Sequence, residues 1–297
     1  MFPNATNLVK DEIALRKSLK NALATVLSPS ELAHLYSSYD IVGDIAIIRL
    51  TSQSKKHGEV IAETLMGIHK NVRTVLAQTG PVTGEFRLRA LEHIAGEHKT
   101  STFHKESGCV FHVDVQRCYF SPRLFYERMR IARQVKGGET VVNMFAGVGC
   151  FSIIIAKHSD VSKAYSIDIN PVAVDYMKEN IRLNRVYGKV VPMLGDAKEI
   201  IKEKLCHVAD RVLMPLPERA FEYLSCALLA LKENGGWIHY YDFEHASKNE
   251  DAAAKVKIKV ANRLTDLGVN FEIPFGRVVR NTGPNWYQVV LDIKVKP

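Results

Sequence analysis

The sequence has few of the features that mark a secreted, metal-bound or membrane protein. Its five cysteines form no Cys-x-x-Cys pair and their number is odd, so neither a disulfide framework nor a structural zinc site is expected. No apolar run reaches the ~20 residues that a membrane span needs. The first residues lack the basic start and apolar core of a secretory signal. These absences predict a cytoplasmic protein without membrane association.

What is present is the composition of an ordinary globular protein. Hydrophobic residues make up 46% of the 297 residues and charged residues 24%, unlike disordered or fibrous chains. The length suits one large domain or two of unequal size. Lys and Arg total 40 against 32 Asp and Glu, which gives a formal net charge of +8. This balance permits a polyanionic partner without requiring one, because net charge governs association rather than chemistry.

The hydrophobic pattern divides the chain into three segments. Residues 1–35 are predicted to be helical, with an amphipathic helix over 8–27 that Ser28-Pro29 ends. The apolar face of this helix holds Leu15, Leu19, Leu23 and Val26. Residues 36–120 are predicted to form a small α+β domain. Its expected elements are strands over 41–50 and 72–78, a helix near 58–70, and a hairpin that joins 100–104 to 109–115.

Residues 121–297 alternate predicted strands with predicted helices. The expected strands are 140–144, 164–167, 190–194, 211–214 and 237–241. This alternation is typical of a parallel sheet that is covered by helices on both faces. The final segment, 288–295, alternates apolar and polar residues, which predicts an antiparallel edge strand.

Three successive predicted strands are followed by residues that suit a nucleoside cofactor. After the first strand, Gly147 and Gly149 can bring the backbone close to a ligand at a helix N-terminus. The second strand leads into Asp168, 19 residues after Gly149, where a carboxylate can accept hydrogen bonds from ribose hydroxyls. The third leads to Asp196, for which a helix N-cap is an equally good interpretation. These groups are expected to meet at the carboxyl edge of the sheet.

A dinucleotide site is the competing interpretation of the glycine-rich turn. Such a site requires Gly-x-Gly-x-x-Gly, and Ser152 occupies the third glycine position here. The sequence also offers no residue pair suited to hydride transfer. The ordered set of Gly-x-Gly, Asp and Asp instead resembles the class I S-adenosylmethionine-dependent methyltransferase fold, an α/β fold with a Rossmann-like sheet.

Four longer motifs are more specific than this turn. They are GEFRLRALEHIAG over 84–96, YFSPRLFYER over 119–128, NMFAGVGCF over 143–151 and DINP over 168–171. From about residue 36 to the end, the chain resembles the archaeal and eukaryotic tRNA (guanine-37, N1) methyltransferases. That family joins a small α+β domain to a class I catalytic domain and methylates N1 of guanine-37 in the anticodon loop. The resemblance implies that residues 36–120 are this small domain, with an RNA-binding or connecting role. The resemblance implies this activity, S-adenosylmethionine as cofactor and tRNA as partner, and we expect a monomer.

The implied reaction explains why certain residue types are needed. N1 of guanine carries a proton at neutral pH, so its attack on the methyl group requires a base. Negative charge then develops on O6 and needs a cation or donor. By resemblance, Glu127 is the base, Arg87 stabilises O6, and Tyr119 shapes the pocket for the guanine. From the residues alone, Glu127 is more simply a solvated carboxylate that pairs with Arg123 or Arg130 at helical spacing.

The resemblance also implies the contacts to cofactor and RNA. The cofactor contacts are Arg128, Phe145, Gly147, Gly149, Asp168, Asp196 and Ala197. The RNA contacts are Arg123, Pro215 and Pro217. A basic segment whose only acid is Glu127 adds to them, and phosphate binding by it would be salt-sensitive; its members are Arg117, Arg123, Arg128, Arg130, Arg133 and Lys136. No metal ion is expected, because the sulfonium of the donor already activates the methyl group.

Two departures from the family pattern bear on function. The family's fourth motif usually reads Asn-Leu-Pro, whereas 215–217 read Pro-Leu-Pro. Pro215 therefore lacks both the side-chain amide and the backbone donor. Many members also carry an N-terminal domain that checks the tRNA elbow, and residues 1–35 are too short for it. Looser selection of full-length tRNA over an anticodon stem-loop is therefore expected.

Two other activities stay open at this point. The related wybutosine-pathway enzyme transfers the aminocarboxypropyl group of the same cofactor to the same tRNA position. Against it, residues 86–89, residues 121–123 and Asp168 follow the methyltransferase pattern. A cofactor-binding RNA module that has lost catalysis is supported only by Pro215.

Overall fold

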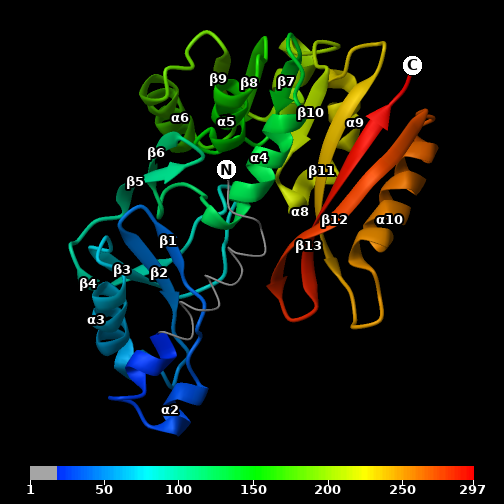
Figure 1. The fold of residues 1–297 in the computed structure, drawn as a ribbon. Helices are drawn as coiled ribbons and strands as arrows, with labels where there is room; N and C mark the ends of the chain where they lie inside the picture. Colours follow the sequence, from blue (N-terminus) through cyan, green and yellow to red (C-terminus); the bar gives the residue numbers. More distant parts are fainter. Residues whose placement is uncertain (1–18) are drawn as a thin grey trace. The chain divides into compact units, whose positions relative to one another are not determined.

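The computed structural model describes residues 19–297, which form two compact units divided between Tyr126 and Glu127 (Figure 1). Unit 1 is a small α+β domain, and unit 2 is a Rossmann-like α/β domain. The predicted fold class is therefore confirmed. Within 19–297, no helix combines the length and the apolar character needed to cross a bilayer.

The predicted helix over 8–27 lies partly outside the described residues. Residues 19–23 are helical and bury Leu19 and Leu23, as expected. The chain then turns, and Val26 is 62% exposed rather than on the buried face. The prediction therefore placed the end of the helix too late.

Ser28-Pro29 begins a helix instead of ending one. Ser28 is the N-cap of α2 (Pro29–Ala33), and its hydroxyl accepts a hydrogen bond from the Glu31 amide. The Glu31 carboxylate accepts one in return from the Ser28 amide, 3.0 Å away. Serine followed by proline, with glutamate three residues after the serine, is the pattern of a capping box at a helix start.

Unit 1 is built on a four-stranded sheet in the order β1-β2-β3-β4. The strand predicted over 41–50 is two antiparallel strands, because Gly43 has a φ of +58° and turns the chain between them. The helix α3 (Gly58–Ile68) crosses from β2 to the parallel strand β3 and packs its apolar side on the sheet. The strands are β1 (Asp40–Val42), β2 (Ile45–Arg49), β3 (Thr74–Gln78) and β4 (Leu91–Gly96).

The predicted hairpin of unit 1 is confirmed. Its strands are β5 (Ser101–Glu106) and β6 (Cys109–Asp114), which pair antiparallel in register. Ser107 and Gly108 form the two-residue turn, and both have positive φ angles. Two such residues in sequence match the twist of the flanking strands, which explains why a glycine stands there.

Unit 2 contains a seven-stranded sheet in the order β12-β13-β11-β10-β7-β8-β9 (Figure 1). The strands β7 to β11 pair parallel to one another, whereas β13 is antiparallel to both β11 and β12. The strands are β7 (Thr140–Asn143), β8 (Lys163–Asp168), β9 (Val190–Leu194), β10 (Arg211–Met214), β11 (Gly236–His245), β12 (Phe271–Gly283) and β13 (Trp286–Val295).

The final strand is antiparallel, as predicted, but it is not at the edge. β13 lies between β11 and β12, and β12 is the edge strand. β12 has no clean alternation, because Pro274 and Gly276 interrupt it and its pairing with β13 shifts register in three places. This irregularity hid the strand from a reading of the sequence.

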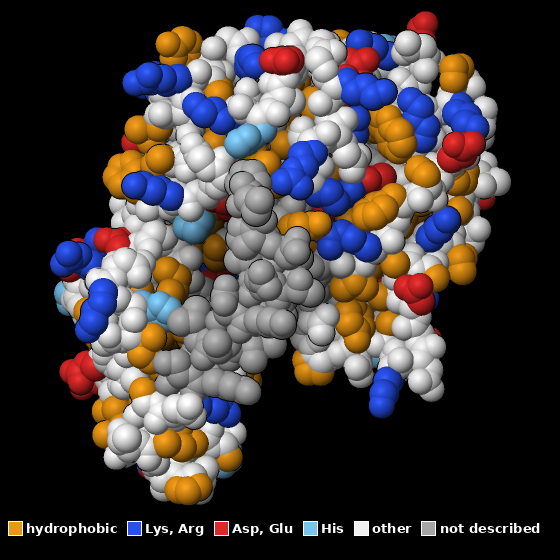
Figure 2. Space-filling view, in the orientation of Figure 1, with side chains coloured by type: hydrophobic (Ala, Val, Ile, Leu, Met, Phe, Trp, Pro, Cys, Tyr) orange, Lys and Arg blue, Asp and Glu red, His pale blue; other side chains and the backbone are white. Residues whose placement is uncertain are grey.

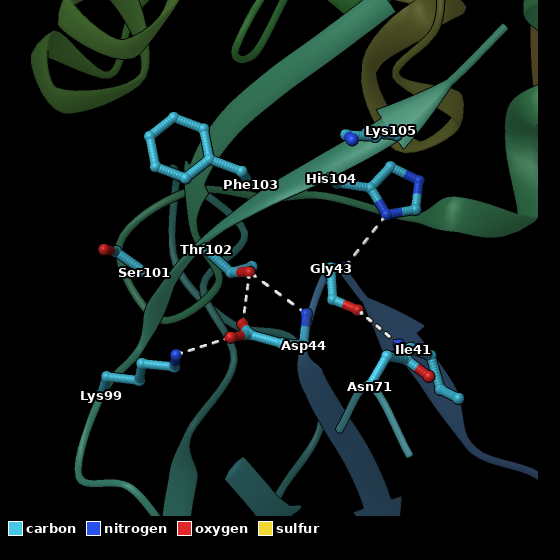
Figure 3. Close-up of a pocket in the computed structure, with 10 residues that line it drawn as sticks. All are labelled: Ile41, Gly43, Asp44, Asn71, Lys99, Ser101, Thr102, Phe103, His104 and Lys105. Carbon is cyan, nitrogen blue, oxygen red and sulfur yellow. Dashed lines mark hydrogen bonds and ion pairs between the residues drawn. The ribbon is translucent and has the colours of Figure 1, made fainter. Parts of the chain in front are cut away.

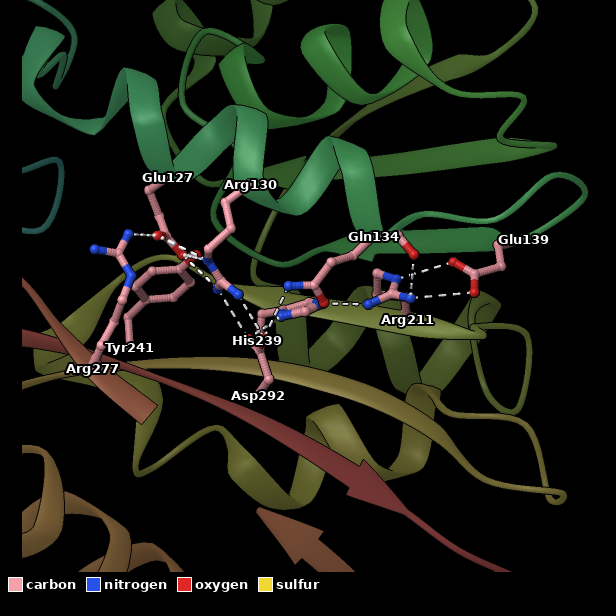
Figure 4. Close-up of polar contacts among 9 residues, drawn as sticks. All are labelled: Glu127, Arg130, Gln134, Glu139, Arg211, His239, Tyr241, Arg277 and Asp292. Atoms are coloured by element: carbon pink, nitrogen blue, oxygen red, sulfur yellow. Dashed lines mark hydrogen bonds and ion pairs between the residues drawn. The ribbon is translucent and has the colours of Figure 1, made fainter. Parts of the chain in front are cut away.

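The two faces of the unit 2 sheet are chemically different. One face packs against α7 (Ala197–Lys204), α9 (Leu224–Ala230) and α10 (Ala252–Asp266) in a purely apolar core. The alternate residues of β10, β11 and β13 point to the other face, where α4 (Phe125–Gln134) crosses the strands (Figure 4). That second face carries the buried charged residues described below.

Candidate active site

The order of the strands in unit 2 reverses its direction at β7. From β7 the chain proceeds outward to β8 and β9, then returns to β10 on the other side of β7. In parallel sheets, ligands bind outside the carboxyl ends of the strands where the direction of winding reverses. Gly147, Asp168, Asp196 and Pro215 all lie at or just after the carboxyl ends of these four strands.

Asp168 closes the turn that follows β7. One of its carboxylate oxygens accepts a hydrogen bond from the Gly147 amide at 2.6 Å, and the other accepts one from the Asn170 amide at 2.9 Å. Burial raises the pKa of this carboxyl group, although these backbone donors oppose the effect. Each oxygen has a second lone pair, which can accept a ribose hydroxyl.

The backbone conformation of the turn explains why two of its residues are glycines. Gly147 and Gly149 have φ angles of +56° and +92°, and Gly149 is the N-cap of α5 (Cys150–His158). A Cβ on Gly149 would lie 2.8 Å from Cγ of Met177 on α6 (Pro171–Leu183). The turn can therefore adopt this shape only with glycine at position 149.

Ser152 does not act as a substitute for the third glycine of a dinucleotide site. It is fully buried, and its hydroxyl lies 3.2 Å from the Asn143 amide nitrogen and 2.7 Å from the Ser166 hydroxyl. These contacts tie α5 to β7 and β8. The Ser152 side chain therefore has a structural role in holding α5 against the sheet.

Asp196 is a helix N-cap, and it also belongs to an aromatic wall. One carboxylate oxygen accepts from the Lys198 amide at 2.6 Å, and the other accepts from the Tyr223 hydroxyl at 2.7 Å. Burial and this hydrogen bond raise the pKa of Tyr223 to about 12. The ring of Phe145 meets Tyr223 edge to face, with centroids 5.2 Å apart. Ala197 follows as the first residue of α7 and is buried.

Three further expected site residues of unit 2 lie in contrasting surroundings. Arg128 is only 4% exposed, and its guanidinium lies 6.0 Å from the centroid of the Phe151 ring. Pro215 follows β10 directly, and Pro217 is the first residue of the short helix α8 (Pro217–Ala220). Pro215 is partly exposed at the carboxyl edge. It presents no hydrogen-bond donor there.

Arg87 and Tyr119 of unit 1 are in direct contact. The Arg87 guanidinium lies 4.7 Å from the centroid of the Tyr119 ring, within the range of a cation–π interaction. Arg87 also has a φ of +54°, in a tight turn closed by a hydrogen bond from its amide to the Gly84 carbonyl. A left-handed backbone in a residue other than glycine costs of order 1–3 kcal/mol and is most often found at functional sites.

Arg123 does not pair with Glu127. Its Nε donates to Asp40 at 2.6 Å, and Arg89 donates to the same carboxylate at 3.3 Å. Arg89 is 9% exposed and also donates to the Phe120 carbonyl, so it holds unit 1 together internally. The possible pair of Glu127 with Arg130, in contrast, is present.

Glu127 is 1% exposed and is surrounded by donors (Figure 4). Its Oε1 accepts from Nη2 of Arg130 at 2.7 Å and from the hydroxyl of Tyr241 at 2.8 Å. Its Oε2 accepts from Nη2 of Arg277 at 2.5 Å. Burial alone would raise the pKa of Glu127, but the Arg130 hydrogen bond and the charges of Arg130 and Arg277 outweigh it and lower the pKa. The carboxylate is therefore ionised.

A buried polar network extends from Glu127 beneath α4 (Figure 4). Arg130 bridges Glu127 to Asp292, with its Nη1 2.6 Å from Asp292 Oδ2. His239 Nδ1 lies 2.6 Å from Asp292 Oδ1, and His239 Nε2 lies 2.7 Å from Nη1 of Arg211. Because arginine can only donate, Nε2 of His239 must accept and Nδ1 must donate. His239 is therefore neutral, in agreement with the lowering of its pKa by burial.

The basic segment divides into residues held inside the protein and residues at its surface. Arg128 is buried, and the side chain of Arg130 is engaged with Glu127 and Asp292. The exposed members are Arg117, Arg123, Arg133 and Lys136. Figure 2 shows Lys and Arg side chains over the face of unit 2 that the view presents, with Asp and Glu among them. Only the exposed members present their side chains to solvent.

Unit 1 also contains a pocket of about 570 Å³ that the sequence did not indicate (Figure 3). Its polar groups bind one another: Asp44 accepts from Lys99 and from Thr102, each at 2.6 Å. The Gly43 amide donates to Nδ1 of His104 at 3.1 Å. These contacts join the β1–β2 turn to β5, so the pocket's polar residues have a structural explanation. Across residues 19–297, no three His, Cys, Asp or Glu side chains are grouped as metal ligands would be.

The sequence analysis missed Tyr223, Tyr241, Arg277, His239 and Asp292. A partial signal for the last two was present, because each is an ionisable residue with apolar neighbours on both sides, Ile238 and Tyr240 around His239 and Leu291 and Ile293 around Asp292. A charge in such a strand is expected to be paired. The partner, however, lies far away in the sequence, and only the sheet register places His239 opposite Asp292.

Two family models match the chain. One described as the TRM5/TYW2 methyltransferase domain matches residues 102–268, and one described as the TYW2 N-terminal domain matches residues 19–100. Together they cover most of the part of the chain that the structure describes.

Curated relatives carry several activities. The chain is 41% identical to tRNA (guanine(37)-N(1))-methyltransferase Trm5b of Pyrococcus abyssi, over 90% of this chain and 78% of that protein. It is 38% identical to tRNA 4-demethylwyosine(37)-methyltransferase Taw21 of Saccharolobus solfataricus, over 88% of this chain and 94% of that protein. It is 32% identical to the tRNA(Phe) (4-demethylwyosine(37)-C(7)) aminocarboxypropyltransferase of Methanocaldococcus jannaschii, over 86% of this chain and 97% of that protein.

Solved structures share the fold and show what related proteins bind. A complex of aTrm5 with tRNALeu superimposes with a TM-score of 0.80 at 34% identity, over 95% of this chain and 79% of that one. Methanocaldococcus jannaschii Trm5 in complex with adenosine gives a TM-score of 0.73 at 34% identity, over 89% of this chain and 76% of that one.

Proposed function

The chain belongs to the TRM5/TYW2 methyltransferase family, and from this premise we propose that it transfers the methyl group of S-adenosylmethionine to N1 of guanine-37 in the tRNA anticodon loop. The observation that carries the proposal is the carboxyl edge of the unit 2 sheet, where Asp168 and the Gly147 turn lie beside a helix N-terminus. The names of the Trm5b relative and the aTrm5–tRNALeu complex support the reaction and the substrate.

The donor groups at this edge suit an adenosyl cofactor. Asp168 is placed to accept the ribose hydroxyls, and the turn over 147–149 lets the backbone approach the ligand. Asp196 and the Phe145–Tyr223 pair offer a carboxylate and an aromatic wall for the adenine. The related Trm5 structure with adenosine supports this assignment. When bound, S-adenosylmethionine supplies a methyl group on a positively charged sulfur.

The chain's own residues then handle the proton and the charge on the guanine. Glu127 is ionised and takes the proton from N1, which frees the nitrogen lone pair to bond to the methyl carbon while the carbon–sulfur bond breaks. Arg87 donates to O6, where negative charge develops. Its contact with Tyr119 and its fixed turn limit the orientations of the guanidinium. Arg123 and the exposed basic residues bind phosphate.

The family's other activity, transfer of the aminocarboxypropyl group, is the second candidate. Two observations favour it: the match of residues 19–100 to the TYW2 N-terminal domain and the 32% identity to an aminocarboxypropyltransferase. The higher identity to Trm5b and Taw21 favours methyl transfer.

Labelled cofactor separates the two candidates in one experiment. S-adenosylmethionine labelled either on the methyl carbon or on the aminocarboxypropyl carbons is incubated with the protein and tRNA, and the nucleosides are analysed by mass spectrometry. We expect the methyl label alone in 1-methylguanosine, and none in a tRNA with adenine at position 37. Incorporation of the aminocarboxypropyl label would overturn the proposal. A parallel tRNA with 4-demethylwyosine at position 37 tests whether the modified base is also methylated.

A further inference from the structure

The two arginines that bind Glu127 are held very differently. Arg130 donates to both Glu127 and Asp292, and its guanidinium also lies 4.7 Å from the centroid of the Phe275 ring. Asp292 is fixed in turn by His239 and by the side chain of Gln134. The Arg130 guanidinium is therefore held between two carboxylates, those of Glu127 and Asp292, in the interior of unit 2.

Arg277 has weaker support. Its side chain is 31% exposed, against 13% for Arg130. Its guanidinium also donates a hydrogen bond to the adjacent Val278 carbonyl at 3.4 Å. It also stands on β12, the edge strand, whose register with β13 shifts at several points. Arg277 is thus the partner that can leave Glu127 without disturbing the core.

The charges within the ion-pair network that connects Glu127, Asp292 and Glu139 to Arg130, Arg211 and Arg277 are balanced while Arg277 is in place. Glu127, Asp292 and Glu139 contribute three negative charges, and three arginines, Arg130, Arg211 and Arg277, contribute three positive charges. His239 and Tyr241 are neutral. Departure of Arg277 would leave one uncompensated negative charge in a buried site, which is unfavourable. Uptake of one proton by Glu127 would restore neutrality.

We propose that Arg277 masks Oε2 of Glu127 in the RNA-free protein and moves to an RNA phosphate when substrate binds, while Arg130 keeps the carboxylate in position. The anionic phosphate offers Arg277 a bidentate partner equivalent to the carboxylate it leaves. Oε2 then becomes the free acceptor for the N1 proton, and the proton takes the place of the Arg277 charge. Arg277 is therefore a positioning residue, and this role rests on the proposed function of Glu127 as base.

The pH dependence of turnover tests the exchange, because kcat/KM reports the pKa of the base in the free enzyme and kcat reports it in the complex. The groups that face Glu127 are Arg130 of α4, Tyr241 of β11, Arg277 of β12 and, through Arg130, Asp292 of β13. Both kcat and kcat/KM should fall at acidic pH, where the base becomes protonated. In the wild type at saturating cofactor, the fall in kcat should be centred at a higher pH than the fall in kcat/KM. In Arg277→Gln, the midpoint for kcat/KM should rise by about one pH unit to the midpoint for kcat, and the midpoint for kcat should not change.

Arg280→Gln is the matched control. Arg280 lies on the same edge strand and donates to Gln288 rather than to Glu127, so both midpoints should remain at their wild-type positions. Equal movement of both midpoints in Arg277→Gln would show that Arg277 stays on Glu127 throughout. Absence of any movement would show that the contact has no influence on the base. Either result overturns the proposal.

A measurement without substrate separates failure of this inference from failure of the proposed function. In protein labelled with ¹³C at the glutamate carboxyl carbons, the Glu127 signal is assigned by its loss in Glu127→Gln and followed by NMR against pH. Its titration should shift upward in Arg277→Gln and stay unchanged in Arg280→Gln. This outcome is independent of the group transferred, whereas an unchanged titration in Arg277→Gln would refute the masking contact directly.

Discussion

His239 and Asp292 stand directly opposite each other on β11 and β13, with Nδ1 of the imidazole 2.6 Å from Oδ1 of the carboxylate. The second imidazole nitrogen accepts from Arg211, so the ring is held as a single neutral tautomer. Because Asp292 in turn holds Arg130, this pair supports the orientation of Glu127 through one intermediate side chain. His239 is therefore a structural support of the candidate site rather than a proton carrier.

Replacement of His239 by phenylalanine should destabilise unit 2. The substitution removes one hydrogen-bond partner from the buried Asp292 carboxylate and one from the buried Arg211 guanidinium, although each keeps an ion-pair partner. A buried polar group that loses a partner costs about 1–3 kcal/mol. Urea denaturation followed by circular dichroism would measure the loss. His158→Phe, at an exposed position, is the control and should change the unfolding free energy by less than about 0.5 kcal/mol.

The neutral state of His239 also predicts a pH dependence of stability. The unfolded chain binds a proton on this histidine below about pH 6.5, whereas burial lowers the pKa in the folded protein. The unfolded state then holds more protons, so stability falls as the pH drops below about 6.5. Denaturation midpoints between pH 7.5 and 5 should show this decline, and His239→Phe should make it shallower.

Acidic pH should remove a second contribution, from Asp292. Hydrogen bonds from His239 and Arg130 outweigh burial and hold its pKa well below the ordinary value in the folded protein. The ion pair therefore stabilises the fold above about pH 4 and its contribution is lost as the pH falls further. Asp292→Asn should flatten the stability profile below pH 4, and a profile as steep as that of the wild type would contradict the assignment.

Removal of the carboxylate at Glu127 should stop transfer without preventing cofactor binding. Loss of a general base typically lowers the rate 10²- to 10⁴-fold. We expect such a loss in single-turnover assays of Glu127→Gln and Glu127→Ala, while calorimetry shows that S-adenosylmethionine still binds. Glu127→Gln keeps the size of the side chain and controls for packing. Unchanged turnover in these variants would remove Glu127 from the mechanism.

Gly149→Ala should impair both folding and cofactor binding. The added Cβ would meet Met177 at 2.8 Å, and the backbone φ of +92° already disfavours alanine. Gly188→Ala is a matched control, because Gly188 has a φ of +89° and nothing within 4 Å of an added Cβ. The control should lose only the backbone cost of about 1–2 kcal/mol. Gly149→Ala should lose more and bind cofactor more weakly, as measured by thermal unfolding and calorimetry.

The sequence predicted those parts of the fold that local patterns determine. The parallel strands β7 to β11 and the hairpin β5–β6 follow from alternating patterns and from Ser107-Gly108. β12 escaped prediction because Pro274 and Gly276 break its pattern, and its pairing is set by β13 instead. The prediction that Ser28-Pro29 ends a helix was wrong, because the same pair of residues can follow one helix and start the next.

The candidate site was predictable only where its residues lie in motifs. Gly147, Gly149, Asp168 and Asp196 follow successive strands, and topology alone brings them to one edge. The surroundings of Glu127 come from three other strands, so no local pattern could link Arg277 or Asp292 to it. The low exposure of Arg128 and Arg130 was likewise invisible in a segment that reads as uniformly basic.

The position of β13 in the sheet has a consequence for the order of assembly. β13 follows β12 in the chain but lies between β11 and β12, so β12 has no strand to pair with until β13 has been synthesised. A ribosome-bound chain that has just completed β12 therefore exposes an unpaired edge on β11. Arg130 also lacks Asp292 at that moment. The support that Asp292 gives to Arg130 beneath Glu127 therefore cannot form before β13 joins the sheet.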